Sequence, residues 1–264
     1  MKYSKYINIS GGSDLNKKYK EIYDSSISDK ENFWKDISEN IFWYKKPKKI
    51  LNSDNPPFYK WFEDGVTNTC YNAVDIHVEK GRGDKLAIIY DSPITGVQKK
   101  ITYKELKNKV ALFAGALKNQ GVNKGDRVII YMPMIPEAVI TMLACGRIGA
   151  IHSVVFGGFA ANELASRIDD SKAKLIVSAS CGYEPGRTIH YKPLVNKALE
   201  LAKHKPEKCI IFQREKDKAD LNPELDISWD DSLKDIKPVE CEKMNANDYA
   251  YILYTSGTTG LPKG

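Results

Sequence analysis

Residues 128–156 read VIIYMPMIPEAVITMLACGRIGAIHSVVF, and this stretch decides the fold class. Its first five residues, 128–132, are apolar or aromatic, as is typical of a buried strand. Pro136 is well suited to the first turn of a helix, and apolar residues follow it to Leu143. Residues 151–156 are a second short apolar run. The order strand, helix, strand predicts one parallel βαβ unit.

The same alternation continues on both sides of this stretch. Thr102 and Glu105 form a capping box that begins a helix, and Gly121 ends it. Residues 213–247 are charged and irregular, which indicates a surface excursion. We therefore predict an α/β fold with a parallel-rich sheet and helices on both of its faces. The further strands are expected at 86–90, 97–101, 175–178, 209–212 and 249–254, and the further helices at 160–168 and 194–202.

The first 83 residues have a different character. Ser28 and Glu31 form a second capping-box pattern, which predicts a short helix containing Phe33 and Trp34. We expect the aromatic side chains of this region to pack onto a larger body rather than to bind a ligand. The predicted domains are an N-terminal segment, 1–83, and the start of a larger domain, 84–264.

Composition is that of a soluble globular protein. Of the 264 residues, 42% are hydrophobic and 28% are charged, which allows one or two domains with a real core. The sequence has no apolar run long enough for a membrane span, and its composition excludes disordered and collagen-like classes. The net charge of +6 comes from interspersed lysines and acids without a basic stripe, so neither a nucleic acid nor a membrane is expected as a partner.

The cysteine spacing indicates a reducing compartment, and the histidine spacing indicates no metal site in the protein. No two of the five cysteines have a C-x-x-C spacing, and residues 1–14 resemble neither a secretory signal nor a transit peptide. We therefore expect a cytoplasmic protein with free, buried thiols. The four histidines are far apart and lack ligands at metal spacing. The cysteines are Cys70, Cys145, Cys181, Cys209 and Cys241, and the histidines are His77, His152, His190 and His204.

Residues 254–264, YTSGTTGLPKG, carry the strongest chemical signal. Glycines let backbone N–H groups approach phosphate oxygens, hydroxyls add hydrogen bonds, and a lysine supplies positive charge. The pattern differs from the P-loop of NTPases, because Leu261 and Pro262 separate the last glycine from the lysine. The residues expected to bind phosphate are Thr255, Ser256, Gly257, Thr258, Thr259, Gly260 and Lys263.

This loop resembles the phosphate-binding signature of the adenylate-forming superfamily, which includes acyl-CoA synthetases, luciferases and peptide-synthetase adenylation domains. In that superfamily the loop cradles the β- and γ-phosphates of ATP while a carboxylate is adenylated. The resemblance implies ATP and Mg²⁺ as cofactors, and it leaves the acid unspecified.

Two further segments resemble the acetyl-CoA and propionyl-CoA synthetase branch. Residues 147–159, RIGAIHSVVFGGF, read as a buried strand that ends in a Gly-Gly turn, and in that branch the aromatic at Phe156 stacks on the adenine of CoA. Residues 181–187, CGYEPGR, place an arginine on a Pro-Gly turn. In acetyl-CoA synthetases two arginines of this segment bind the 3′-phosphate of CoA. The resemblance assigns CoA binding to Phe156, Gly157, Gly158, Glu184, Pro185, Gly186 and Arg187.

One of those two arginine positions is Glu184 here, so that only Arg187 carries over as a phosphate ligand. Lys192 or His190 are hypothetical substitutes for the missing cation. The Glu-Pro-Gly-Arg turn, with Trp61-Phe62 and residues 68–75 upstream, looks like the propionyl-CoA synthetase branch. We interpret residues 68–75 as helix entry and packing rather than catalysis.

The resemblance implies a reaction in two halves. ATP and propionate give propionyl-adenylate and pyrophosphate, and CoA then displaces AMP to give propionyl-CoA. Alternatives left open are an acetyl-CoA synthetase, a non-catalytic nucleotide or CoA binder, and an enzyme that loads a carrier protein. The sequence ends at Gly264, before the acyl pocket, hinge and catalytic lysine of the family, so we locate no catalytic residue and expect residues 1–264 alone not to turn over. No pattern indicates an oligomeric state.

Overall fold

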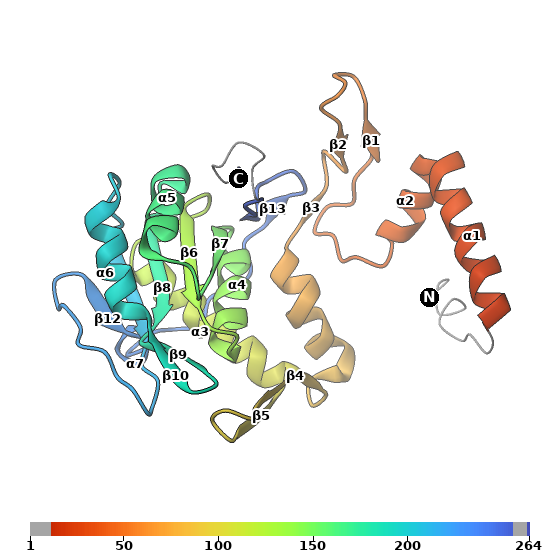
Figure 1. The fold of residues 1–264 in the computed structure, drawn as a ribbon. Helices are drawn as coiled ribbons and strands as arrows, with labels where there is room; N and C mark the ends of the chain where they lie inside the picture. The colour runs from red at the N-terminus through yellow and green to blue at the C-terminus, as the bar shows by residue number, and fades with distance from the viewer. Residues whose placement is uncertain (1–11, 256–262) are drawn as a thin grey trace. The chain divides into compact units, whose positions relative to one another are not determined.

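The computed structural model describes residues 12–255 and 263–264 (Figure 1). By their internal contacts the residues form two compact units. The N-terminal unit comprises residues 1–67 with 243–248, and the core unit comprises residues 68–242 with 249–264. The predicted domain boundary between residues 83 and 84 stays a prediction.

The N-terminal unit begins with two helices, α1 (Gly12–Ser28) and α2 (Lys30–Ser38). The predicted helix around Phe33 is therefore confirmed, but its predicted cap is wrong. Asp29 is the N-cap residue of α2, whereas the Ser28 hydroxyl donates to the Asp24 carbonyl oxygen at 2.8 Å. Because Ser28 still belongs to α1, its hydroxyl bonds back into that helix and is not available to α2.

Short antiparallel ladders and paired aromatic rings make up the rest of the N-terminal unit. β1 (Leu51–Asn52) pairs with β2 (Lys60–Trp61), and β3 (Val66–Thr67) pairs with β13 (Met244–Asn245). The ring centroids of Trp34 and Trp61 are 6.0 Å apart. The aromatic side chains therefore contact one another inside this unit, and their packing onto a larger body stays a prediction.

A six-stranded sheet forms the centre of the core unit, in the order β12-β11-β8-β6-β7-β14. Every neighbouring pair in it is parallel. Residues 128–131 of the central strand β6 are fully buried, which agrees with their uninterrupted apolar sequence. The strands are β6 (Arg127–Met132), β7 (Ile151–Phe156), β8 (Leu175–Ala179), β11 (Lys208–Phe212), β12 (Asp226–Ser228) and β14 (Tyr251–Ile252).

Helices cover both faces of this sheet, as predicted (Figure 1). α3 (Tyr103–Asn119) and α4 (Pro136–Ile148) pack together on one face, and α5 (Ala161–Ser171) and α6 (Tyr191–Leu201) pack together on the other. The capping box of α3 is confirmed, because the Glu105 N–H donates to the Thr102 hydroxyl and the Thr102 N–H donates to the Glu105 carboxylate.

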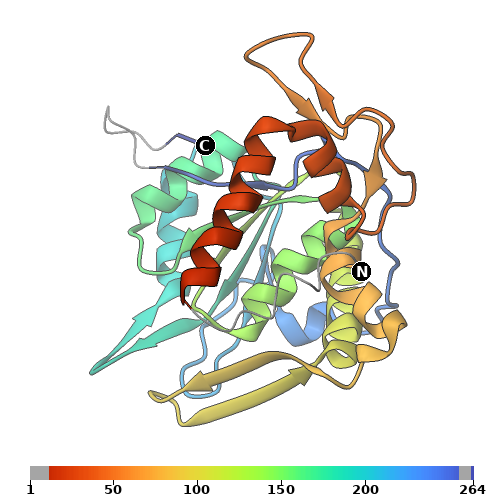
Figure 2. The same ribbon diagram turned by 90° about the vertical axis from the view of Figure 1, so that its right-hand side faces the viewer.

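Smaller elements complete the core unit. Two π-helical turns, η2 (Tyr71–Asp75) and η3 (Val78–Arg82), precede the antiparallel hairpin of β4 (Leu86–Ser92) and β5 (Val97–Thr102). A second hairpin, β9 (Cys181–Glu184) with β10 (Arg187–His190), follows β8. Figure 2 shows the two hairpins as arms that project at the same end of the core unit. None of the helices within residues 12–255 is both long and apolar enough to cross a membrane.

The interpretation of residues 213–247 as an irregular surface excursion is wrong in part. This stretch contains the edge strand β12 and the short helix α7 (Trp229–Ser232). Trp229 is buried, and its ring stacks on Phe113 at a centroid distance of 3.8 Å. These two elements are short and flanked by charged residues, so the sequence shows no periodic apolar pattern there.

The last predicted strand is shorter than expected. Only β14, residues 251 and 252, joins the sheet, where it pairs with His152 and Ser153 at the start of β7. The chain leaves the sheet before Tyr254 and does not run as a strand into the predicted phosphate loop.

Candidate functional site

The ring of Phe156 is available to a ligand. This residue ends β7, and its side chain is 67% exposed, a large fraction for an aromatic residue. One neighbour supports the ring from the side: Phe159 lies at a centroid distance of 5.7 Å in an edge contact. A planar, exposed ring held in this way can stack on a nucleobase.

Tyr191 joins the two segments that were predicted to bind CoA. A Cβ atom on Gly157 would lie 2.7 Å from the Cζ atom of Tyr191, and a Cβ atom on Gly182 would lie 2.9 Å from the same atom. The tyrosine is buried at the start of α6 and also contacts Tyr131, with ring centroids 5.0 Å apart. Glycine is therefore required at both positions because a side chain of this protein fills the space. Tyr191 was not among the predicted site residues, because its only sequence signal is a glycine in each segment.

Gly157→Ala is expected to destabilise the core unit by about 1–3 kcal/mol, the usual cost of overpacking. The added methyl group would overlap the Tyr191 ring, which is buried and packs against Tyr131. Denaturant-induced unfolding measures the change. Gly83→Ala is the matched control, because its Cβ would meet Val78 at 3.5 Å, an ordinary contact. Equal effects of the two substitutions would show that Tyr191 does not restrict Gly157.

Glu184 and Arg187 form an ion pair at the tip of the β9–β10 hairpin. The Arg187 Nε donates to a Glu184 carboxylate oxygen at 2.7 Å, and one terminal nitrogen lies 2.6 Å from the same oxygen. The Arg187 side chain is 70% exposed, and exposed pairs contribute at most about 1 kcal/mol. An incoming phosphate can therefore compete with Glu184 for the guanidinium group. In the hairpin the Glu184–Arg187 pair is two residues along β9 from Gly182, which contacts Tyr191.

The two residues suggested as substitute cations differ in their surroundings. Lys192 is buried, and its ammonium lies 2.8 Å from the Asp226 carboxylate. Its charge is therefore neutralised inside the unit, and the hypothesis that Lys192 contacts phosphate is wrong for this structure. His190 is 58% exposed and lies 3.5 Å from an Asp217 oxygen, so its ring remains open to solvent.

The structure describes only the two ends of the predicted phosphate loop. Backbone hydrogen bonds of 3.0 and 3.2 Å join Thr255 and Lys263 in both directions, and both residues are exposed. The loop thus begins and ends at one backbone bridge, with the lysine next to the first threonine. The predicted phosphate-binding residues between them, Ser256, Gly257, Thr258, Thr259 and Gly260, lie outside the described residues.

Tyr254 fixes the chain just before this bridge. Its hydroxyl donates to the Asp170 carboxylate at 2.6 Å, and burial raises the pKa of the phenol. The guanidinium carbon of Arg167 lies 5.1 Å from the Tyr254 ring centroid and 5.0 Å from that of Phe159. Arg167 therefore forms cation–π interactions with both Phe159, near the CoA segment, and Tyr254, at the start of the phosphate loop. Periodicity placed this arginine on a helix but gave no sign of either contact.

The structure brings the two predicted CoA segments together through Tyr191, and Arg167 lies between the rings of Phe159 and Tyr254, which flank the CoA segment at Phe156 and the phosphate loop. Phe156 is the last residue of β7, whereas β14 pairs with His152 and Ser153 near its beginning. Because β14 and β7 are parallel, the chain runs from β14 to the phosphate loop in the direction in which β7 runs to Phe156.

A cleft lies outside the carboxyl ends of β6, β8 and β11. The connections from β6 and β8 leave in opposite directions there, and open parallel sheets bind ligands at such switch points. Tyr183 lines this cleft, and the guanidinium carbon of Arg214 lies 4.7 Å from its ring centroid. The empty space is about 560 Å³, and its other walls include Tyr90, Lys99, Pro136, Glu137, Phe212 and Lys216.

Comparison with known families gives two matches. Residues 75–264 match the model of the family described as AMP-binding enzyme, and residues 19–73 match the model described as acetyl-coenzyme A synthetase N-terminus. The first match covers most of the core unit.

Relatives in other organisms agree with these matches. The chain is 51% identical over 247 residues to acyl-CoA synthetase short-chain family member 3, mitochondrial, from Homo sapiens. That alignment covers 93% of this chain and 36% of the human protein. It is 44% identical over 245 residues to acetyl-coenzyme A synthetase from Streptomyces avermitilis, covering 92% of this chain and 37% of that protein. The chain thus spans about a third of the length of these relatives.

A solved structure has the same fold. Acetoacetyl-CoA synthetase from Streptomyces lividans superposes with a TM-score of 0.80 at 23% identity, over 90% of this chain and 36% of that one. At this identity the likeness concerns the fold alone. It agrees with the predicted fold, which is the N-terminal part of the large domain of an acyl-CoA synthetase.

Proposed function

The chain belongs to the AMP-binding enzyme family, in its short-chain acyl-CoA and acetyl-CoA synthetase group, and we propose that its protein makes propionyl-CoA from propionate, ATP and CoA. The observation that carries this proposal is that Tyr191 contacts both Gly157, next to Phe156, and Gly182 in the segment 181–187. In this proposal the exposed ring and the exposed arginine hold the nucleotide end of CoA. A cytoplasmic location stays part of the proposal.

The ATP half of the reaction is assigned to residues 255–263. When ATP is bound, the family's Mg²⁺ offsets the charge of its phosphates, and Lys263 and the loop hydroxyls hold their oxygens. The backbone bridge from Thr255 to Lys263 supports this assignment, because it keeps the positive charge at the base of the loop. The chain's contribution is to position and neutralise the phosphates rather than to form covalent bonds.

Propionate is proposed over acetate from the Glu-Pro-Gly-Arg turn at residues 184–187, which looks like the propionyl-CoA synthetase branch. Acetate is the second candidate, favoured by the 44% identity to the acetyl-coenzyme A synthetase of Streptomyces avermitilis. Both acids use the same ATP and CoA segments, so the choice between them does not affect the roles assigned here.

Phe156→Ala tests the proposed division of the site in the full-length protein. Stacking on a base contributes about 1–3 kcal/mol, so the KM for CoA is expected to rise roughly 5- to 150-fold. Acid-dependent exchange of pyrophosphate into ATP does not need CoA, so that exchange rate is expected to stay unchanged. Steady-state kinetics with varied CoA and an exchange assay together measure both halves.

Leu201→Ala is the control, because this side chain is also exposed but lies at the far end of α6. It is expected to change neither quantity. A wild-type protein without acid-dependent exchange would refute the adenylation reaction itself. Normal exchange with an unchanged KM for CoA in Phe156→Ala would refute only the CoA assignment.

A further inference from the structure

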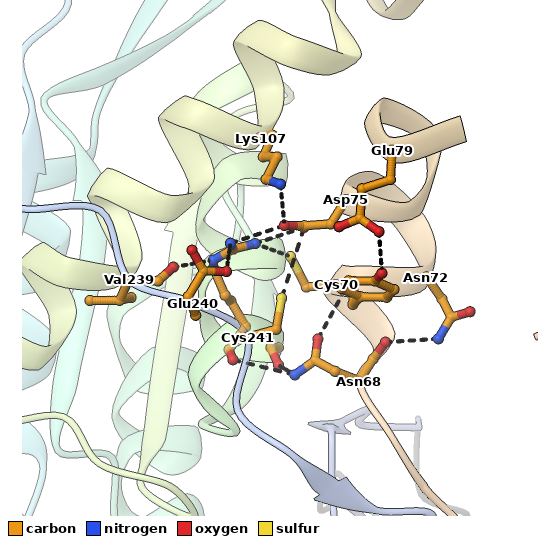
Figure 3. Close-up of polar contacts among 12 residues, drawn as sticks. Asn68, Cys70, Asn72, Asp75, Glu79, Lys107, Val239, Glu240 and Cys241 are labelled. Atoms are coloured by element: carbon orange, nitrogen blue, oxygen red, sulfur yellow. Dashed lines mark hydrogen bonds and ion pairs between the residues drawn. The ribbon is translucent and has the colours of Figure 1, made fainter. Parts of the chain in front are cut away.

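A buried group of polar side chains in the core unit has no part in the proposed reaction. We call it the thiol cluster and define it as Cys70, Asp75, Lys107, Arg147 and Cys241. Cys70 is the N-cap residue of η2 and Asp75 is its last residue, Lys107 and Arg147 come from α3 and α4, and Cys241 lies in the strap of residues 239–242 (Figure 3). Sequence spacing missed it because its two cysteines are far apart along the chain.

Two sulfur atoms face each other in this cluster. The Cys70 Sγ, the Cys241 Sγ and an Asp75 carboxylate oxygen all lie within 4.8 Å of one another. Figure 3 shows both sulfur atoms on the same side of the Asp75 carboxylate. Cys70 is fully buried, whereas Cys241 is partly exposed and offers the way in from solvent.

The charges around the sulfurs favour one thiolate. The Arg147 guanidinium donates two hydrogen bonds to Asp75, at 2.7 and 3.0 Å, and the Lys107 ammonium lies 3.3 Å from the same carboxylate. Two cations thus face one carboxylate. The excess positive charge is directed at Cys70, whose Sγ lies 3.7 Å from an Arg147 nitrogen. Glu240 is 3.8 Å from Arg147 but 95% exposed, so solvent screens its charge.

The pKa shifts of the two thiols agree with this charge distribution. A hydrogen bond from the Cys241 thiol, with the Arg147 charge, lowers the pKa of Cys70, while the same hydrogen bond raises the pKa of Cys241. Cys70 is therefore the more acidic of the two thiols. Burial raises the pKa of Cys145 and of Cys209 to about 12, so these two thiols stay protonated and unreactive.

Hydrogen bonds hold the strap that carries Cys241 against Arg147 and Asn68. The Arg147 Nε donates to the Val239 carbonyl oxygen at 2.6 Å, and the Glu242 N–H donates to the Arg147 carbonyl oxygen at 2.7 Å. The Asn68 amide donates to the Glu242 carbonyl oxygen at 2.8 Å. These bonds hold the two sulfurs together without a covalent link.

We propose that Cys70 and Cys241 are an oxidative modification site, at which hydrogen peroxide converts the two thiols to a disulfide. The Cys70 thiolate attacks one peroxide oxygen, the O–O bond breaks, and hydroxide leaves. The Cys241 sulfur then attacks the Cys70 sulfenic acid, the S–S bond forms, and the hydroxyl group leaves with the thiol proton as water. Peroxide is reduced by two electrons and the two sulfurs are oxidised by two.

A metal ion fits the cluster less well than a disulfide. Both Asp75 oxygens are already engaged by the Arg147 guanidinium, and two fixed cations lie within hydrogen-bond or ion-pair distance of that carboxylate. A divalent cation would enter an environment that is already positive.

The test treats the full-length protein with hydrogen peroxide, blocks the remaining thiols with an alkylating reagent and maps its peptides without reduction. The expected result is a linked peptide pair that contains Cys70 and Cys241 and is lost after reduction. Cys145 and Cys209 serve as internal controls and are expected to be alkylated only after unfolding. Lys107→Ala removes the partly exposed cation and is expected to slow disulfide formation about 2- to 10-fold, because a smaller fraction of Cys70 is thiolate.

Two further measurements make the outcome decisive. Disulfide formation is expected to raise the midpoint temperature of thermal unfolding by several degrees, and Cys241→Ser is expected to abolish that rise. Recovery of Cys70 and Cys241 as separate, reduced peptides after peroxide treatment would overturn the proposal. So would a stoichiometric zinc ion in the protein as purified that Cys241→Ser removes.

Discussion

Arg147→Ala is expected to lower the free energy of unfolding of the core unit by about 3–5 kcal/mol, the usual cost of removing one partner from a buried ion pair. The Arg147 and Asp75 side chains are only 1% and 2% exposed, and two hydrogen bonds join them. Alanine would leave the Asp75 carboxylate buried, with the Lys107 ammonium still 3.3 Å away. The arginine also holds the strap of residues 239–242, so the loss is expected to include those contacts.

Denaturant-dependent unfolding measures this effect, and two other variants serve as comparisons. Lys197→Ala breaks an exposed pair with Glu200 on α6 and is expected to cost less than about 1 kcal/mol. Replacing both Arg147 and Asp75 with apolar residues of similar volume is expected to recover much of the loss, because neither partner is then left as an unpaired buried charge. If Arg147→Ala were no more harmful than Lys197→Ala, the buried pair would not stabilise the fold.

Lys263→Ala is expected to lower kcat/KM for ATP roughly 10- to 150-fold in the full-length protein. The estimate follows from the loss of one hydrogen bond to a charged group, about 1.5–3 kcal/mol. Thr255 holds the lysine backbone through two hydrogen bonds, so the substitution removes the charge and keeps that bridge. The KM for CoA is expected to change little, because CoA binding is assigned to Phe156 and residues 181–187 rather than to this loop.

Acid-dependent pyrophosphate exchange at varied ATP measures the Lys263 effect. Lys263→Arg keeps the positive charge and is expected to retain more activity than Lys263→Ala, while Lys197→Ala is expected to match the wild type. An undiminished kcat/KM in Lys263→Ala would remove this lysine from the ATP site.

Local sequence patterns predicted the core of the fold well. The apolar runs at β6, β7, β8 and β11 and the capping box at Thr102 each depend on neighbouring residues, so their pattern is complete within a short window. The short elements were missed for the opposite reason. β12 is three residues long, and it is stabilised by pairing with β11 rather than by any periodicity of its own.

Residues of the site could be predicted only where they belong to a sequence motif. Phe156 and Arg187 came from resemblance, whereas Tyr191 and Arg167 are defined by contacts with residues distant in sequence. The thiol cluster could not be predicted from the sequence for the same reason. Cys70, Arg147 and Cys241 carry no shared spacing, and only the folded chain shows that a buried charge links them.

The proposed reaction is tested most directly by the products that the full-length protein forms from ATP, CoA and either propionate or acetate. We predict stoichiometric AMP, pyrophosphate and acyl-CoA with both acids, and a higher kcat/KM for propionate than for acetate. A clear preference for acetate would refute the proposed substrate but leave the reaction standing. Formation of ADP and phosphate, or the absence of any acid-dependent acyl-CoA, would contradict the account.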